Sequence, residues 1–299
     1  MAATLDFGLM LQAIAQKNVP ASEMSEYNRA LIDRLEPGFS TIWLEDHLHW
    51  GEIGALECLT TLSYLAGAYP QYHFGSLVLA QSYRNPALLA KMAANLQLLS
   101  RGRFILGLGA GWKEDEYRAY GYPFPGVKTR LEELEEAASI VKKMWSEHPA
   151  SFEGKHYQIR AASCEPRPDP PPPLLIGGGG ESRTLAIVAR HADWWNFNSC
   201  PIEVYRHKVE LLKEHCARIG RDPIEIKLTY LSTVSVSEKP EQVERSSEKH
   251  FVAGNSAEVI QEIEQLQALG VTHCIFRFRD PGSLERFVQS VLPHFASER

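Results

Sequence analysis

Residues 174–197 read LLIGGGGESRTLAIVARHADWWNF, which is an apolar run, a glycine loop, a helical stretch and a second apolar run. Leu174–Ile176 predicts a buried strand, Glu181–His191 a helix, and Asp193–Phe197 the next strand. A strand, a helix and a strand in this order require two parallel strands joined by a right-handed crossover. This unit therefore indicates an α/β architecture.

The same unit repeats along the whole chain. Eight strand–helix units predict a (β/α)8 TIM barrel. A doubly wound sheet would need a glycine fingerprint after its first strand, and residues 8–13 do not contain one. The predicted strands are Leu5–Met10, Phe39–Leu44, His73–Ala80, Phe104–Gly109, Leu174–Ile176, Asp193–Phe197, Ile224–Val236 and Val271–Phe278. The predicted helices are Ser22–Glu36, Gly54–Tyr69, Pro86–Gly102 after an Asn85 N-cap, Leu131–His148, Glu181–His191, Pro201–Ile219, one capped by Asn255 with Glu258, and one beginning at Asp280–Pro281.

One segment interrupts this alternation, between the fourth helix and the fifth strand. Residues 149–173 contain a predicted small hairpin at Phe152–Ile159 and a proline-rich stretch at Pro166–Pro173. An excursion of this length in a compact domain usually carries function or covers a site. We interpret it as an insertion, so that residues 1–299 are expected to form a single barrel domain.

The composition excludes several classes of protein. The chain has 299 residues, 31 Lys and Arg against 37 Asp and Glu, and a net charge of −6. Because it has no basic run, nucleic-acid binding is not expected. Its five cysteines form no CxxC pair, which is typical of reduced thiols in the cytoplasm. No signal peptide is apparent, and the longest uncharged stretch, Cys58–Tyr83, is too polar to span a membrane.

A polar cluster, Glu45–Trp50, directly follows the second predicted strand. In a TIM barrel the chemistry lies at the C-terminal ends of the strands, so Asp46 and His47 are candidate catalytic residues. The alternative is a helix cap by Asp46 and a surface histidine. His47 and His49 also match the His-x-His pair of zinc hydrolases, but the sequence offers no further ligand at a later strand end, so we predict no metal.

The four glycines Gly177–Gly180 lie between a predicted strand and a predicted helix. Without side chains they allow backbone N–H groups to approach a ligand, and the helix N-terminus favours an anion. Arg183 supplies a charge for the same anion. We therefore predict a phosphate site in this loop, the alternative being a tight turn without a ligand.

Two further strand ends carry possible binding residues. The glycines of Gly107–Trp112, among them Gly109, would allow a flat ligand to lie against the backbone. Arg277 and Arg279 share one face of the last strand, where they would meet an anionic cofactor tail or a substrate. A solvent-exposed strand end is an equally good interpretation of the two arginines.

Taken together, these segments resemble the luciferase-like flavin monooxygenase superfamily, and most closely its branch of deazaflavin (coenzyme F420)-dependent oxidoreductases. They run in the family order from about Phe7 to Pro223. The motifs that carry the resemblance are Trp43–His47, Gly75–Val78, Tyr83–Pro86, Gly107–Trp112 continuing to Glu116–Tyr117, Phe152–Gly154 with Tyr157, Pro173–Gly180 and Ala192–Asn196.

The resemblance implies a barrel that holds a flavin or deazaflavin ring at its mouth. A non-proline cis peptide, here Leu77–Val78, would form a bulge behind the ring, and Asp46 and His47 would lie near its reactive edge. Relatives are commonly homodimers. The cofactor-binding residues implied are Asp46, Ser76, Leu77, Val78, Gly109, Gly177, Gly178, Gly179, Gly180, Ser182, Arg183, Asn196 and Asn198.

The function predicted on this basis is hydride transfer between F420 and a small organic substrate. His47 would transfer the proton, and Asp46 would set its tautomer or contact the polar edge of the ring. Trp50, Trp112 and Arg279 would form the substrate pocket. In the sugar-phosphate dehydrogenases of the superfamily a glutamate follows the glycines of the fourth-strand loop, where Trp112 stands here, so sugar-phosphate oxidation is not expected.

Three other functions remain open at this point. An FMN-dependent monooxygenase using reduced flavin and oxygen would share the barrel and the phosphate loop. A cofactor-binding protein without turnover would share them too, and a zinc hydrolase would use His47 and His49 instead.

Overall fold

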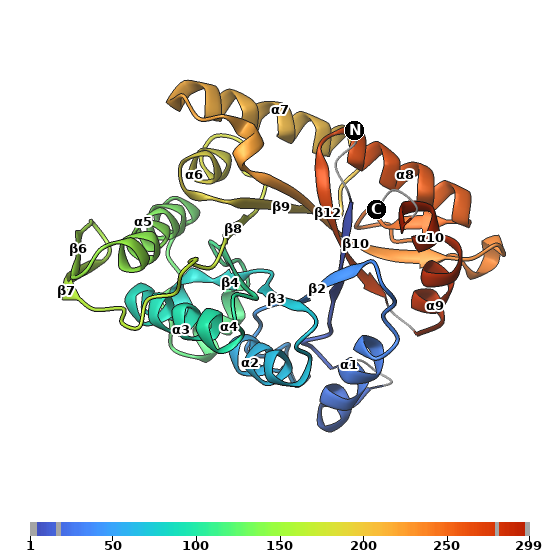
Figure 1. Ribbon diagram of the computed structural model, residues 1–299, viewed down its shortest axis with the longest axis horizontal. Coiled ribbons are helices and arrows are strands. Elements are labelled where there is room, and N and C mark those ends of the chain that lie inside the picture. Colours follow the sequence, from blue (N-terminus) through green and yellow to red (C-terminus); the bar gives the residue numbers. More distant parts are fainter. Residues whose placement is uncertain (1–4, 16–18, 279–280, 297–299) are drawn as a thin grey trace.

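Eight parallel strands close into a barrel in the computed structural model, which describes residues 5–15, 19–278 and 281–296 (Figure 1). Around the barrel the order is β10, β12, β1, β2, β3, β5, β8, β9 and again β10. This confirms the predicted fold class. The barrel strands are β1 (Asp6–Met10), β2 (Phe39–Leu44), β3 (His73–Ser76) with its continuation β4 (Leu79–Ala80), β5 (Phe104–Gly109), β8 (Leu174–Gly177), β9 (Trp194–Asn198), β10 (Lys227–Val236) and β12 (Val271–Phe278).

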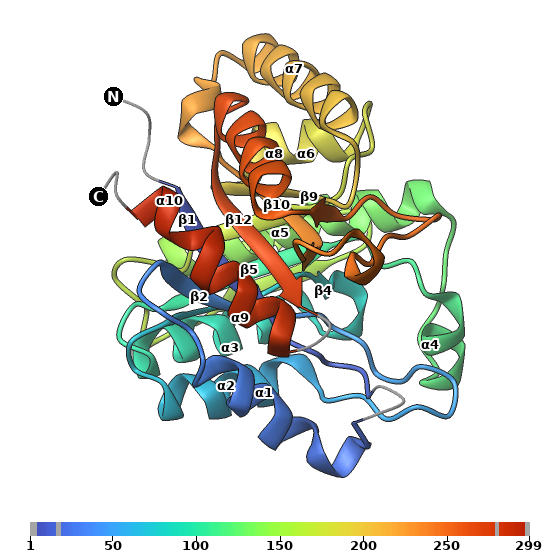
Figure 2. The same cartoon turned by 90° about the vertical axis from the view of Figure 1, so that its right-hand side faces the viewer.

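Helices surround the barrel, and at least one lies between each pair of consecutive barrel strands in the chain (Figures 1 and 2). None of the described helices is both long and apolar enough to cross a lipid bilayer. The helices are α1 (Met24–Ile32), α2 (Cys58–Ala68), α3 (Pro86–Leu99), α4 (Glu114–Ala119), α5 (Val127–Ser146), α6 (Thr184–His191), α7 (Ile202–Ile219), α8 (Ser256–Ala268), α9 (Pro281–Ser290) and α10 (Leu292–Ala296).

The predicted helix caps are confirmed. The Asn85 side chain accepts hydrogen bonds from the backbone of α3, and Pro86 occupies its first turn. Asn255 and Glu258 form the capping box of α8. The second helix begins at Cys58 rather than at Gly54, because the Glu57 carboxylate accepts from its first backbone N–H groups.

Other boundaries differ from the predictions. The third strand is interrupted after Ser76 and resumes at Leu79, and the peptide bond between Leu77 and Val78 is cis, as the resemblance implied. The seventh strand begins at Lys227, because Pro223–Glu225 forms a short 3-10 helix. The short helix α4 and the short strand β11 (Val252–Gly254) were not predicted.

Trp43 fills the interior of the barrel. The side chain on β2 is fully buried and donates through Nε1 to Thr41 Oγ1 at 2.6 Å. Gly8 on β1 and Gly75 on β3 leave the space that the indole occupies, since a Cβ atom at either position would overlap it. The barrel is therefore a packed core rather than a pore.

The insertion forms the predicted hairpin, with β6 (Ala150–Glu153) antiparallel to β7 (Gln158–Ala162). It lies outside the barrel beside α5, on the left in Figure 1. The Glu136 carboxylate of α5 accepts the backbone N–H groups of Lys155, His156 and Tyr157, which fixes the hairpin turn. The Tyr157 hydroxyl donates to Gln81 just after β4 at 2.9 Å, so the hairpin supports that segment from outside.

Candidate active site

A cavity of about 910 Å³ opens at the C-terminal ends of the barrel strands. Its wall includes Met10 at the end of β1, Gly109 at the end of β5 and Gly177 at the end of β8. Its volume lies within the range of about 300–1,000 Å³ that small-molecule sites occupy. Because TIM barrels carry their chemistry at this end, the cavity is the candidate active site.

The structure brings most of the predicted site residues to this cavity. Ser76, Gly179, Ser182 and Arg183 do not line it, and neither does the insertion. Arg279 lies outside the described residues. The predicted residues that line the cavity are Asp46, His47, Trp50, Leu77, Val78, Gly109, Trp112, Gly177, Gly178, Gly180, Asn196 and Asn198.

His47 lies on the loop after β2 and pairs with a carboxylate that the sequence reasoning did not single out. Its Nδ1 lies 3.0 and 3.2 Å from the two carboxylate oxygens of Glu116, on α4. The backbone N–H groups of Leu48 and His49 also donate to Glu116 Oε1. Glu116 is 1% exposed, so this carboxylate is held among donors inside the protein.

Two tryptophans border the His47 imidazole. The Trp50 ring lies edge-on to it at 5.0 Å between centroids, and the Trp112 ring lies edge-on at 6.0 Å. The Lys113 ammonium lies 4.8 Å from the Trp50 ring centroid. Trp112 is 66% exposed, so it stands at the rim of the cavity, where a bound molecule would cover it.

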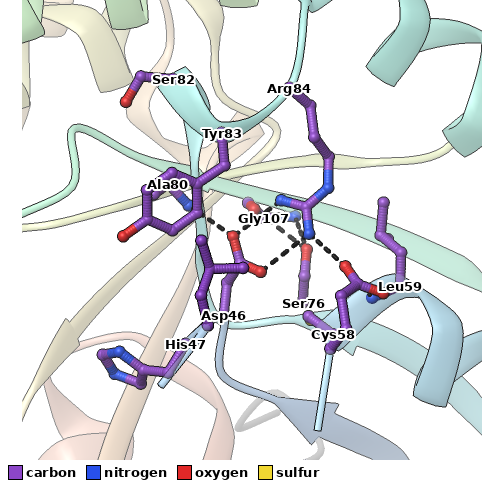
Figure 3. Close-up of polar contacts among 12 residues, drawn as sticks. Asp46, His47, Cys58, Leu59, Ser76, Ala80, Ser82, Tyr83, Arg84 and Gly107 are labelled. Carbon is purple, nitrogen blue, oxygen red and sulfur yellow. Dashed lines mark hydrogen bonds and ion pairs between the residues drawn. The ribbon is translucent and has the colours of Figure 1, made fainter. Parts of the chain in front are cut away.

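Asp46 lies next to His47 in sequence but pairs with Arg84 instead. In Figure 3 the Asp46 carboxylate points toward Arg84, while the His47 imidazole points away from both. Arg84 donates to the two oxygens of Asp46 at 2.8 and 3.0 Å, and Ala80 N donates to Oδ2 at 3.1 Å. The expectation that Asp46 sets the tautomer of His47 is therefore wrong, because Glu116 makes that contact.

The Arg84 guanidinium also binds Glu57, the cap of α2 (Figure 3). Burial by itself lowers the pKa of Arg84, but its hydrogen bonds and attraction to Asp46 and Glu57 raise that pKa above its usual value. The guanidinium therefore stays charged and joins the loop after β2 to the segment after β4.

Glycines surround the bulge at Leu77–Val78. A Cβ atom at Gly109 would lie 2.6 Å from Val78 Cγ2, and one at Gly177 would lie 2.8 Å from Val78 Cγ1. Ser76 Oγ donates to the Gly107 carbonyl oxygen at 3.0 Å and accepts from Gly107 N at 2.9 Å. The bulge therefore packs directly against glycines of β5 and β8, and no room for a larger side chain remains at these glycines.

The tetraglycine turn leads from β8 into α6. Gly178 adopts a φ of +123°, which other residues rarely reach, and its carbonyl oxygen accepts from Trp195 Nε1 at 2.8 Å. No side chain caps α6 at its N-cap residue, Arg183. In the first turn Leu185 N donates to the Gly180 carbonyl oxygen at 3.0 Å, and the end of the helix dipole favours an anion beside this turn. Arg183 itself is half exposed and pairs with Glu132 at 3.6 Å.

Arg277 also borders the cavity, near the end of β12. It donates to Glu45 Oε2 at 2.7 Å. Its Nε atom is buried and has no partner in the part of the chain that the structure describes. This donor can therefore serve a ligand that supplies an acceptor oxygen.

The Nδ1 atoms of His47 and His49 both lie close to oxygen atoms of the protein. His47 Nδ1 is occupied by Glu116, and His49 Nδ1 lies 3.2 Å from the Gly51 carbonyl oxygen. Over residues 5–15, 19–278 and 281–296 no group of three or more His, Cys, Asp or Glu side chains is placed to hold a metal ion.

These features define a ligand-binding TIM barrel. They are a closed (β/α)8 barrel, a cavity at the strand ends, a glycine-bordered bulge and a helix N-terminus without a side-chain cap. The family model described as luciferase-like monooxygenase matches residues 5–286. The chain belongs to this family, as the motifs indicated.

Curated relatives include both deazaflavin-dependent and oxygen-using proteins. An F420-dependent glucose-6-phosphate dehydrogenase of Kineococcus radiotolerans is 35% identical over 138 residues, 45% of this chain and 41% of that protein. The pyrimidine monooxygenase RutA of Methylorubrum extorquens is 29% identical over 184 residues, 58% of this chain and 47% of that protein. The chain therefore matches less than half the length of either relative.

Among solved structures, an F420-dependent secondary alcohol dehydrogenase in complex with an F420-acetone adduct has a TM-score of 0.82 at 18% identity. The likeness covers 96% of this chain and 98% of that chain. This structural likeness supports the assignment of the chain to the TIM-barrel fold.

Proposed function

We propose that the protein is an oxidoreductase that transfers a hydride between deazaflavin F420 and a small organic substrate. The observation that carries the proposal is the placement of the His47–Glu116 pair in the wall of a cavity that also reaches the bulge and the tetraglycine turn. The similarity to an F420-dependent dehydrogenase supports the choice of cofactor.

The residues present fit such a cofactor. The uncapped N-terminus of α6 suits a phosphate, and Gly177, Gly178 and Gly180 allow it to approach the backbone. The bulge at Leu77–Val78 would lie against the ring, and Asn196 and Asn198 would flank it. When bound, a deazaflavin supplies a two-electron hydride acceptor or donor.

The protein would supply the proton transfer. When a hydride leaves a carbon that bears a hydroxyl group, the hydroxyl proton must leave as well, and His47 Nε2 would accept it. Trp50 and Trp112 would wall the substrate and exclude water. Arg277, through its unpartnered Nε, would bind an acceptor oxygen of the substrate.

Reconstitution of the purified protein tests the cofactor. Binding titrations with F420 and with FMN should give the tighter dissociation constant for F420. Reduction of bound F420 by candidate alcohols, followed by its absorbance, then tests turnover. Tight FMN binding without F420 binding would instead favour a monooxygenase like RutA, the second candidate.

A variant of one glycine tests the role of the bulge. A methyl group at Gly177 would displace Val78 toward the cavity. Overpacking of this kind costs roughly 1–3 kcal/mol of free energy. We therefore expect Gly177→Ala to weaken F420 binding by about 10- to 100-fold, measured by titration.

The matching control removes the clash. Once Val78 is alanine, the nearest Val78 atom to a Cβ at Gly177 is its own Cβ, 3.6 Å away. Val78→Ala should therefore restore binding to the Gly177→Ala variant. It should not rescue Gly107→Ala, since a Cβ there overlaps the backbone carbonyl oxygen of Ser76. Equal affinity of Gly177→Ala and the wild type would contradict this role.

We also propose a homodimer that forms through α2 and α3. Large apolar side chains are exposed on this face, and Leu99 is 83% exposed. These residues are Tyr64 on α2 and Leu88, Met92, Leu98 and Leu99 on α3.

Sedimentation measurements test this face. The double variant Leu88→Asp/Leu99→Asp should be monomeric, because dimerisation would bury two charges without partners. Ile224→Asp, at an equally exposed residue outside α2 and α3, should leave the dimer intact. A monomeric wild-type protein would refute the dimer.

The five cysteines carry free thiols. This supports the proposal that the protein works in a reducing compartment such as the cytoplasm.

A further inference from the structure

Both oxygens of the buried Glu116 carboxylate have hydrogen-bond partners. Oε1 accepts the backbone N–H groups of Leu48 and His49 at 2.8 and 3.2 Å. Oε2 lies 3.0 Å from His47 Nδ1 and 3.3 Å from the Tyr83 hydroxyl. His47 Nδ1 also lies 3.2 Å from Oε1, so the imidazole faces both oxygens and is nearer to Oε2, while only Oε1 accepts from the loop backbone in the part of the chain that the structure describes.

The Tyr83 hydroxyl is a donor in this arrangement. Burial, and next the charge of Glu116, raises the pKa of Tyr83 above its usual value, so the phenol keeps its proton. All the groups around Glu116 can then donate to it if His47 Nδ1 carries a proton. A carboxylate that carries no proton only accepts hydrogen bonds, so this arrangement gives both oxygens of Glu116 donors.

The other ring nitrogen has a different environment. His47 Nε2 has no hydrogen-bond partner among the described residues, and His47 lines the cavity. A neutral imidazole with its proton on Nδ1 presents a lone pair at Nε2. That nitrogen is then free to take a proton from a substrate.

We propose that Glu116 is a positioning residue that fixes His47 in the Nδ1–H tautomer, so that Nε2 faces the cavity as a proton acceptor. The inference deepens the proposed oxidoreductase function and rests on it for its effect on turnover. The tautomer itself is a property of the protein without cofactor or substrate.

The structure explains why glutamine at this position would reverse the tautomer. In Glu116→Gln the amide oxygen would stay at the Oε1 position, because Leu48 N and His49 N both need an acceptor there. The amide NH2 group would then occupy the Oε2 position and donate to His47 Nδ1. His47 would respond by carrying its proton on Nε2, where it can no longer accept one.

Nitrogen NMR of the protein with 15N-labelled histidines tests the tautomer directly. The His47 signals are those that disappear in His47→Ala. In the wild type we expect the unprotonated ring nitrogen to be Nε2, and in Glu116→Gln we expect it to be Nδ1. Tyr83→Phe removes one donor to the same carboxylate and should leave the wild-type tautomer in place.

Turnover provides the second readout. Glu116→Gln should lower kcat of F420 reduction by about 10- to 100-fold, at or below the lower limit of the range of 10²–10⁴ that general acid–base groups supply, because the His47 imidazole itself remains. KM should change by much less, and Glu116→Asp, which keeps an accepting carboxylate, should recover part of the loss. Glu114→Gln makes the same chemical change on the exposed side of α4 and is the matched control.

The outcomes separate the two levels of the inference. A wild-type His47 with its proton on Nε2, or a Glu116→Gln variant that keeps the proton on Nδ1, would overturn the role of Glu116. If the tautomer switches between the wild type and Glu116→Gln as expected, but the wild-type protein reduces no F420, only the proposed function is overturned.

Discussion

Replacing His47 with alanine should lower kcat/KM for F420 reduction by about 10²–10⁴-fold, the range that a general acid–base group contributes. The hydroxyl proton of the substrate would then have to leave to water, and Trp50 and Trp112 border the position from which water would enter. F420 affinity should change by no more than a few-fold, because the proposed phosphate site at the tetraglycine turn and the bulge lie elsewhere on the cavity wall. Single-turnover absorbance measurements with a parallel binding titration separate the two quantities.

The chain offers a close control for this variant. His49 lies two residues away, stacks on Tyr120 at 6.0 Å between centroids, and does not line the cavity. His49→Ala should therefore keep kcat/KM within a few-fold of the wild type. If His47→Ala and the wild type reduced F420 equally fast, a group other than His47 would accept the substrate proton. If neither reduced it while both bound it tightly, the protein would be a cofactor carrier.

The fold follows from local pattern to a large extent. Apolar runs and helix caps such as Asn85 and Asn255 act within a few residues, so the eight strand–helix units could be predicted from the sequence. The interruption of the third strand at Leu77–Val78 has no such local signature, and only the family resemblance indicated it. The cap by Glu57 was missed because a glutamate is an uncommon N-cap residue.

The candidate site shows the same division between local and distant causes. The rule that strand ends carry the chemistry indicated His47 and the glycine loops, and the family resemblance indicated Asn196. His47, Asn196, Gly109 and Gly177 all line one cavity. The partners of these side chains were not predictable, because Glu116 is 69 residues from His47 and Arg84 is 38 residues from Asp46. The only available signal for Glu116 was its place in the motif that continues the fourth-strand loop. Adjacency in sequence favoured Asp46 as the partner of His47. In the structure His47 instead contacts Glu116, and Asp46 pairs with Arg84.

Replacing Arg84 with methionine should destabilise the protein by about 3–5 kcal/mol, because it leaves a buried charge without its partner. The Asp46 side chain is fully buried and, among the residues that the structure describes, would retain the hydrogen bond from Ala80 N alone. Glu57 would lose the same partner, but its side chain is 37% exposed and can be solvated. Urea unfolding measures the change as a shift in the free energy of unfolding.

The double variant Arg84→Met/Asp46→Leu distinguishes this cause from a loss of packing. Replacing both members of a buried ion pair with apolar side chains is often neutral or stabilising, so much of the lost stability should return. Asp46 would then be needed for stability only as the counterpart of Arg84. A double variant as unstable as Arg84→Met would show that the methionine fails to fill the space of the guanidinium. If the double variant is stable and still binds F420 with wild-type affinity, Asp46 does not contact the cofactor, and its remaining predicted role at the polar edge of the ring is wrong.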